Sequence, residues 1–248
     1  MTTILNVSAY RFVALPDPHA WRALIHARAQ AAGLRGTVLL APEGLNLVLA
    51  GAPPDLRGFV AWLREQAPFG DLETKESVSA ALPFRRLKVK VKREIIRMDH
   101  PTIRPQQRRA PLLGAATLAR WLDDGRDDAG REVVTLDTRN AFEVDAGRFA
   151  GAIDWRLARF SDFPAAALAQ RAALQGKAVV SYCTGGIRCE KAALFLQETG
   201  LADVWQLDGG LLKYFELTGG RHFEGRCFVF DERSLLDTAL QPAPAEAV

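Results

Sequence analysis

The chain has 248 residues, of which 48% are hydrophobic and 25% charged, and its formal net charge is +3. This length and composition predict two compact globular units and exclude a chain that is disordered throughout. No segment approaches the ~18 consecutive apolar residues of a membrane helix, and "MTTILNVSAYRF" lacks the basic and apolar regions of a signal peptide. We therefore expect a cytoplasmic protein with no membrane contact.

Residues 1–98 are predicted to form a ferredoxin-like α+β domain. Strand patterns cover residues 4–15 and both halves of residues 36–51, and helix patterns cover residues 16–33 and 55–68. The first of these helices has prolines near its start and a glycine at its end, as helix boundaries often do. A lysine-bearing strand then closes the order β-α-β-β-α-β, the split unit of ferredoxin-like folds.

Positive charge is concentrated in residues 84–109. This segment holds ten Lys or Arg and two acidic residues, a charge of +8, so the rest of the chain carries −5. Leu87, Val89 and Val91 alternate with lysines, the pattern of a strand with one buried and one solvated face. Such a basic face is typical of a charged edge strand or of a surface that follows nucleic-acid phosphates. The candidate phosphate-binding residues, called here the basic stripe, are Arg85, Arg86, Lys88, Lys90, Lys92 and Arg93.

The second half of the chain alternates strands with helices after a proline-marked linker at residues 99–113. Over residues 114–224 this alternation predicts an α/β domain with a parallel sheet and with functional loops at the carboxyl ends of its strands. Residues 225–248 are expected to form a C-terminal extension whose last residues are disordered. The predicted helices cover residues 115–125, 162–176 and 189–200, and the predicted strands cover residues 133–137, 152–155, 177–182 and 203–207.

A cysteine stands at the carboxyl end of one predicted strand, in "SYCTGGIRCEKAALFL". The glycines after Cys183 permit a tight loop whose N–H groups point inward, and the helix start that follows carries a partial positive charge. Both features, together with the cation of Arg188, favour the Cys183 thiolate and lower its pKa. A packing cysteine does not require this surrounding, so we predict a catalytic nucleophile. The predicted active-site loop consists of Thr184, Gly185, Gly186, Ile187 and Arg188.

Other polar residues of this half are supporting candidates. Asp137 and Arg139 follow a strand end, where they either brace the cysteine loop through a charge pair or form a plain surface pair. Cys189 is either a resolving thiol or a packing residue, and Cys227 is predicted to be a packed strand residue. Three cysteines are too few for a disulfide scaffold, so any cysteine chemistry is catalytic or redox. The four histidines have no metal-ligand spacing, and no GxGxxG or P-loop pattern occurs, so we predict no metal site and no recognisable cofactor.

Three segments resemble a rhodanese domain: "VVTLDTRNAFEVDAGRFAGAIDW", "VVSYCTGGIRCEKAA" and "VWQLDGGLLKYF". The resemblance covers residues 112–222 and implies a cysteine that heads an anion-cradling loop and can carry a persulfide. Four residues separate Cys183 from Arg188, whereas the related Cdc25-like phosphatases have five, so the shorter loop argues against phosphatase activity.

Further segments extend the similarity over nearly the whole chain, residues 4–233. "RGTVLLAPEGLN", "PFRRLKVKVKREII" and "GRCFVFDER", together with the cysteine loop, resemble the bacterial tRNA uridine hydroxylase family. Members of that family join a ferredoxin-like domain to a rhodanese domain. The resemblance implies an oxygen-dependent enzyme that makes 5-hydroxyuridine at the wobble position of tRNA, with the family's active cysteine at Cys183. Its implied partners are the tRNA anticodon stem-loop and molecular oxygen as co-substrate.

Two alternatives remain open from the residues alone. The cysteine loop by itself fits a rhodanese-type sulfurtransferase that takes a persulfide from a sulfur donor. A rhodanese module without catalytic activity that binds RNA is the third hypothesis, and it requires Cys183 to be dispensable.

Overall fold

The computed structural model describes residues 3–243, and its chain forms two compact units. The first unit consists of Met1–Arg97 and Phe230–Arg233, and the second of Met98–Val229 and Ser234–Val248. Disorder was expected over the tail, residues 240–248, and this is wrong for residues 240–243: the Ala243 N–H donates to the Leu235 carbonyl at 3.0 Å, and the Gln241 N–H donates to the Asp237 carboxylate at 2.9 Å. Residues 244–248 lie outside the described residues.

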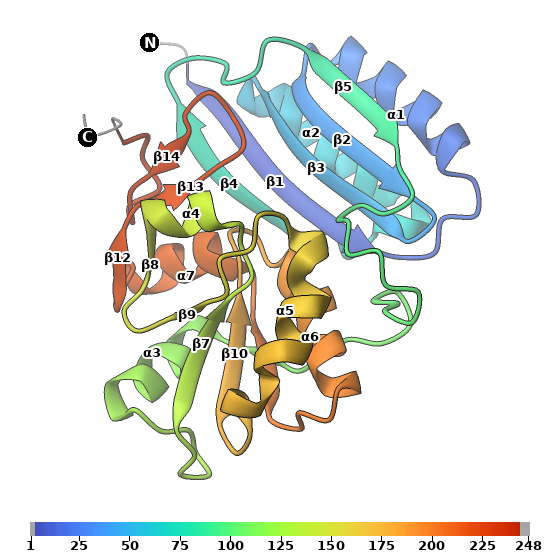
Figure 1. Ribbon diagram of the computed structural model, residues 1–248. Helices are drawn as coiled ribbons and strands as arrows, with labels where there is room; N and C mark the ends of the chain where they lie inside the picture. The colour runs from blue at the N-terminus through green and yellow to red at the C-terminus, as the bar shows by residue number, and fades with distance from the viewer. Residues whose placement is uncertain (1–2, 244–248) are drawn as a thin grey trace. The chain divides into compact units, whose positions relative to one another are not determined.

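The first unit is one five-stranded sheet with helices on one face (Figure 1). The strand order is β4-β1-β3-β2-β5, with antiparallel pairing except that β5 runs parallel to β2. Side chains from both helices and from all the strands except β4 form the buried core between the layers. The elements are β1 (Ile4–Phe12), α1 (Pro18–Ala31), β2 (Arg35–Ala41), β3 (Gly44–Gly51), α2 (Pro53–Glu65), β4 (Thr74–Ser79) and β5 (Leu87–Val91).

One strand assignment made from the sequence is wrong. The strand that closes the β-α-β-β-α-β unit is β4, which pairs antiparallel with β1, whereas the lysine-bearing strand β5 is a fifth strand added at the opposite edge, beside β2. The sequence of β4, "TKESVS", is polar on both faces and none of its residues is fully buried, so it gives no hydrophobic alternation to detect. The ferredoxin-like fold class itself is confirmed.

Local chemistry fixes the first helix. The Asp17 carboxylate accepts hydrogen bonds from the N–H groups of His19 and Ala20, at 3.0 and 2.9 Å, and Pro18 occupies the first helical turn. These bonds satisfy N–H groups that have no partner within the helix, and proline loses nothing there because its missing N–H would be unpaired. Ile25 and Ala29, on the apolar face of the helix, are fully buried against the sheet.

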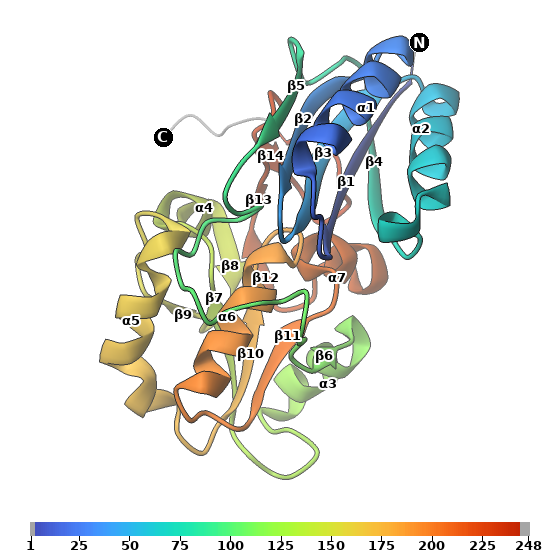
Figure 2. The same ribbon diagram turned by 90° about the vertical axis from the view of Figure 1, so that its right-hand side faces the viewer.

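The second unit is an α/β domain built on a five-stranded, wholly parallel sheet with the order β6-β11-β10-β7-β9. Helices α5 and α6 lie on one side of this sheet, and α3 and α7 lie on the other (Figures 1 and 2). The predicted parallel architecture is thus confirmed. The main elements are β6 (Leu112–Leu113), α3 (Ala115–Asp124), β7 (Val133–Asp137), α4 (Ala141–Ala146), β8 (Gly147–Phe149), β9 (Ile153–Asp154), α5 (Phe163–Gln170), β10 (Ala178–Tyr182), α6 (Ile187–Glu198), β11 (Val204–Leu207) and α7 (Gly210–Thr218).

Strand β10 is the middle strand of this sheet, and all five of its residues are buried. A middle strand covered by helices on both faces reads as a continuous apolar run, as "AVVSY" nearly does. The carboxyl end of β10 is therefore a fixed point deep in the domain, from which the next residue, Cys183, is positioned.

Residues 98–113 belong to the second unit and contact its helix α6. The Thr102 hydroxyl donates to the Glu198 carboxylate at 2.6 Å, and the Arg108 guanidinium donates to the Gln197 side-chain oxygen at 2.6 Å. The segment expected as a linker thus has specific side-chain contacts with the domain that follows it.

After α7 the chain forms three short strands, β12 (Phe223–Gly225), β13 (Cys227–Phe228) and β14 (Leu235–Leu236). Between β13 and β14, residues 230–233 belong to the first unit. There the Glu232 N–H donates to the carbonyl of Pro83 at 3.1 Å, the Glu232 carboxylate pairs with Arg85 at 3.0 Å, and Arg233 donates to the Ser77 hydroxyl at 2.7 Å.

Candidate active site

Cys183 lies directly after β10, and the loop Thr184–Gly186 carries the chain into α6. The Gly186 N–H donates to the Cys183 sulfur at 3.1 Å, and Gly186 has a φ of 98°, a conformation that glycine adopts without the strain other residues incur. Cys183 is fully buried, whereas Thr184, Gly185 and Ile187 are half-buried. The predicted loop thus wraps the sulfur and presents the Gly186 N–H to it.

The start of α7 fixes the other side of this loop. The Leu211 N–H donates to the Cys183 carbonyl at 2.9 Å, and the Leu212 N–H donates to the Thr184 carbonyl at 3.1 Å. A Cβ atom on Gly210 would lie 2.5 Å from the Cys183 carbonyl oxygen and 2.7 Å from the Gly186 nitrogen. Only glycine leaves room for this contact, so the turn "LDGG", residues 207–210, holds the cysteine loop in place.

The surroundings of Cys183 favour its anion. Burial by itself would raise the pKa of the thiol, but the Cys189 thiol, the Arg188 guanidinium and the N–H groups of Cys189 and Arg188 together lower this pKa from 9.0 to about 5. At neutral pH Cys183 is therefore a thiolate, the nucleophilic form of cysteine.

Arg188 is held by a carboxylate that the sequence analysis missed. Its guanidinium makes a two-pronged ion pair with Glu143 of α4, at 2.5 and 2.8 Å, and both side chains are buried. Glu143 also accepts from the Asn140 N–H at 3.0 Å, at the start of α4. "NAFE" carries the Asn-x-x-Glu spacing of a helix start, which could have located α4, but no spacing in the sequence links Glu143 to Arg188.

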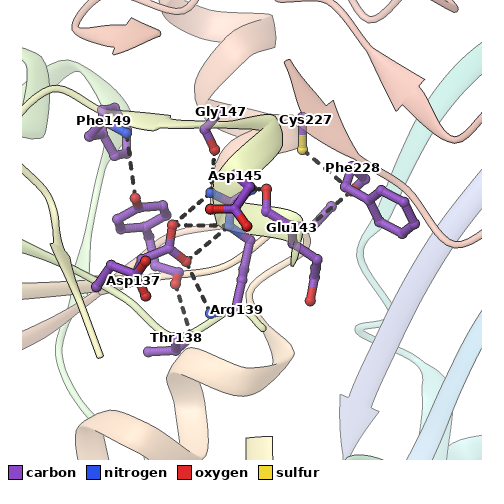
Figure 3. A network of polar contacts seen from close by, with 12 residues as sticks. Asp137, Thr138, Arg139, Glu143, Asp145, Gly147, Phe149, Cys227 and Phe228 are labelled. Carbon is purple, nitrogen blue, oxygen red and sulfur yellow. Dashed lines mark hydrogen bonds and ion pairs between the residues drawn. The ribbon is translucent and has the colours of Figure 1, made fainter. Parts of the chain in front are cut away.

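Asp137 and Arg139 form a fully buried ion pair at the end of β7, so the alternative of a surface pair is wrong. The Arg139 guanidinium donates to the Asp137 carboxylate at 2.6 Å and to the Gly147 carbonyl, also at 2.6 Å (Figure 3). The Arg139 N–H closes the turn by donating to Asp137 at 3.0 Å. Arg139 also donates to the Glu143 carbonyl at 3.3 Å, so the pair contacts the residue whose carboxylate binds Arg188.

Cys189, in the first turn of α6, is buried, and its sulfur lies 3.8 Å from the Thr138 hydroxyl oxygen. Its thiol is one of the groups that lower the pKa of Cys183. Burial raises the pKa of Cys189, and the adjacent Cys183 raises it further, so Cys189 remains a neutral thiol. Cys227 is fully buried in β13, as predicted for a packed strand residue, and burial raises its pKa to about 12.

The basic stripe belongs to the first unit, and all six of its side chains are exposed. Val89 is buried on the opposite face of β5, so the predicted alternation of this strand is confirmed. The structure thus divides the predicted residues into two groups, the cysteine loop with Asp137, Arg139 and Cys189 in one unit, and the basic stripe in the other. Arg85 is already paired with Glu232.

Among residues 3–243, no group of three or more His, Cys, Asp or Glu side chains is arranged to hold a metal ion. Over the same residues, no helix combines the length and apolar character that crossing a membrane requires.

Comparison with known proteins places this geometry in a family. Residues 4–95 match a family described as UPF0176 acylphosphatase like domain, and residues 115–217 match the rhodanese-like domain family. A protein of Bordetella petrii named tRNA uridine(34) hydroxylase is 61% identical over 247 residues, which cover 100% of this chain and 98% of that protein.

The chain belongs to the tRNA uridine(34) hydroxylase family. Two other tRNA uridine(34) hydroxylases show the same extent of similarity: that of Bordetella avium is 60% identical over 97% of this chain and 99% of its own length, and that of Variovorax paradoxus is 60% identical over 100% of this chain and 94% of its own length. The resemblance to tRNA uridine hydroxylases read from the sequence motifs is therefore confirmed.

Proposed function

We propose that this protein hydroxylates the wobble uridine of tRNA to 5-hydroxyuridine, with molecular oxygen as co-substrate and Cys183 as nucleophile. The observation that carries the proposal is the identity of about 60% over the full chain with proteins named for this activity. The Cys183 thiolate, with its pKa of about 5, supplies the reactive group that the chemistry needs.

Addition of the thiolate to C6 of uracil makes C5 electron-rich, and oxygen is then captured at C5. A persulfide on Cys183 could serve as the nucleophile in the same position. Because Cys183 is fully buried, the base must displace part of the half-buried rim formed by Thr184, Gly185 and Ile187 to reach the sulfur. The wobble base lies in the single-stranded anticodon loop, so presenting it requires less unstacking than extracting a base from a duplex.

The basic stripe is the proposed contact for the tRNA phosphates. Six exposed cations lie on or directly beside one edge strand, and exposed Lys and Arg side chains supply the salt-dependent part of nucleic-acid affinity. A simple sulfur carrier does not need such a surface. A tRNA substrate also supports a cytoplasmic location for the enzyme.

A second candidate is supported by the match of residues 115–217 to the rhodanese-like family, because a low-pKa cysteine in that loop can also accept a sulfur atom from a donor. This sulfurtransferase reading predicts a sulfur-containing product.

One experiment separates the two functions. The purified enzyme is incubated with unmodified tRNA under heavy-isotope oxygen, and the nucleosides are digested and weighed. The hydroxylase predicts a 5-hydroxyuridine that carries the label and forms only in the presence of oxygen. A sulfur-containing uridine that forms equally well without oxygen would support the sulfurtransferase instead.

A further inference from the structure

The proposed hydroxylation needs two electrons beyond those the uridine supplies. One atom of molecular oxygen enters the C5–H bond and the other leaves as water, so the reaction is balanced only if a reductant contributes two electrons and two protons. Two thiols that close to a disulfide supply that number. The following inference rests on the proposed function and concerns the source of these electrons.

A second thiol is already in place beside the nucleophile. Cys189 lies in the first turn of α6, the helix at whose start the Gly186 N–H donates to the Cys183 sulfur at 3.1 Å. The Cys189 thiol lowers the pKa of Cys183, and both cysteines are free thiols. The Cys189 sulfur lies 3.8 Å from the Thr138 hydroxyl oxygen. The Cys189 sulfur thus contacts a hydroxyl group and interacts with the Cys183 thiolate, which simple apolar packing does not require.

The residue that holds Cys189 is itself fixed to the central strand. The Thr138 hydroxyl donates to the Tyr182 carbonyl at 2.9 Å, and the Thr138 N–H donates to the same carbonyl at 3.0 Å. Tyr182 directly precedes Cys183. Thr138 thus links the Cys189 sulfur to the residue that directly precedes Cys183.

We infer that Cys189 is a second catalytic residue and that the Cys183–Cys189 pair supplies the two electrons of each hydroxylation by closing to a disulfide. The third cysteine, Cys227, lies in β13, and its thiol donates to the carbonyl of Phe228 at 3.7 Å. It therefore offers a matched control.

The step balances in atoms and electrons. After Cys183 adds to C6 and oxygen is captured at C5 as a hydroperoxide, the Cys189 sulfur attacks the terminal oxygen and the O–O bond breaks. The electron pair of that bond stays on the C5 oxygen, which takes the Cys189 proton and becomes the hydroxyl group, and Cys189 becomes a sulfenic acid. Loss of the C5 proton expels Cys183 from C6 and restores the C5–C6 double bond. Cys183 then attacks the sulfenic acid, which forms the disulfide and releases water.

The protonation states suit this sequence. Cys183 is anionic at neutral pH and attacks first, whereas the raised pKa of Cys189 keeps on it the proton that the C5 oxygen needs. An external dithiol reductant must reopen the disulfide before the next turnover, so the cycle has an obligatory thiol–disulfide exchange step.

A single-turnover experiment tests the inference. The enzyme is reduced with dithiothreitol, freed of reductant without oxygen, and exposed to oxygenated buffer with or without unmodified tRNA. We expect about one 5-hydroxyuridine and one Cys183–Cys189 disulfide per chain with tRNA, then an arrest that added dithiothreitol relieves. Trypsin cuts after Arg188 and separates the cysteines into residues 178–188 and 189–191, so the disulfide is seen by mass as two joined peptides.

Cys227→Ala should keep the full yield of 5-hydroxyuridine in the first turnover. Cys189→Ser should lose at least nine tenths of this yield without a change in the midpoint of thermal unfolding. Four results would each overturn the inference and leave the hydroxylase function standing. They are more than one 5-hydroxyuridine per chain without reductant, 5-hydroxyuridine without a disulfide, a disulfide that forms equally fast without tRNA, and a full first turnover in Cys189→Ser. Absence of 5-hydroxyuridine even in excess dithiothreitol would overturn the proposed function, and the inference with it.

Discussion

Variants of the buried ion pair between Arg188 and Glu143 can show separately what the pair contributes to the stability of the fold and to the ionisation of Cys183. We consider Arg188→Gln, Glu143→Gln and the double variant. Arg188→Gln removes a cation that lowers the pKa of Cys183 and leaves Glu143, which is fully buried, without its partner. Glu143→Gln leaves a buried guanidinium instead.

The burial of this pair sets the expected changes in unfolding free energy and in the pKa of Cys183. Loss of one member of a buried pair costs about 3–5 kcal/mol of unfolding free energy, because an unpaired charge stays in the interior. The double variant should cost about 3 kcal/mol less than the sum of the single changes. An opposite charge close to a thiolate lowers its pKa by about 1–3, so both variants that lack Arg188 should have a Cys183 pKa raised by that amount. A thiol whose pKa reaches about 8 is only about one tenth ionised at pH 7.

The assay combines two measurements on each variant. Urea unfolding gives the free energy of unfolding, and the pH titration of thiolate ultraviolet absorbance gives the pKa of Cys183, with Cys183→Ser as the blank. The double variant should recover stability but not the low pKa. If Arg188→Gln leaves the pKa of Cys183 near 5, the thiolate is held by the loop N–H groups and Cys189 alone, and the role assigned here to Arg188 is wrong.

Three further predictions concern the nucleophile and the basic stripe. Cys183→Ser should stay folded and lose all hydroxylation, because a serine hydroxyl is far less ionised than this thiol. As far as Cys183 ionisation controls it, the rate of the wild-type enzyme should be constant above about pH 6 and fall as pH decreases through about 5, because the lowered pKa keeps Cys183 ionised down to that range. The unfolding free energy of the wild-type protein, measured relative to Cys183→Ser, should decline as pH falls from 9.0 toward about 5. Replacing Lys88, Lys90 and Lys92 with Gln should flatten the log–log dependence of tRNA affinity on salt by about 2–3.

The controls follow from the same structure. Full hydroxylation by a folded Cys183→Ser protein would remove Cys183 from the reaction, and a rate independent of pH down to about 4 would contradict the thiolate requirement. For the basic stripe, an unchanged salt slope would make it a solvated edge strand only. The matched charge control replaces three basic residues of the second unit with Gln and should leave the slope as it is: Arg120, Arg126 and Lys177.

The cysteine loop could be predicted from the sequence because its determinants are local. The strand, the glycines and the helix start that surround Cys183 are consecutive in the chain, and each has its own signal. Strand β4 could not be predicted in the same way, because its residues are polar on both faces and its place is set by backbone pairing with β1. The hydrophobic alternation of β5 was detected instead, so β5 was assigned as the closing strand of the β-α-β-β-α-β unit in place of β4.

The partner of Arg188 illustrates a different limit. Glu143 precedes Arg188 by 45 residues, and only the parallel packing of β7 against β10 brings the segments that carry them together. The pair Asp137–Arg139 was found because the two residues are close in the sequence, but its burial depends on the Gly147 carbonyl and on the sheet around it. Contacts between distant segments thus decided which charged residues support the thiolate.

Residues 230–233 have a consequence for how the gene can be shortened or recombined. Because this segment is part of the first unit, the chain passes between the two units three times, near residues 97, 229 and 233. A stop codon after residue 229 would spare the rhodanese-matching region yet remove the partners of Arg85, Ser77 and Pro83. A fusion that joins the N-terminal unit to another domain at residue 97 would lose the same contacts. Exchange of either unit between proteins must therefore carry this short segment with it, which favours inheritance of the two units as one piece.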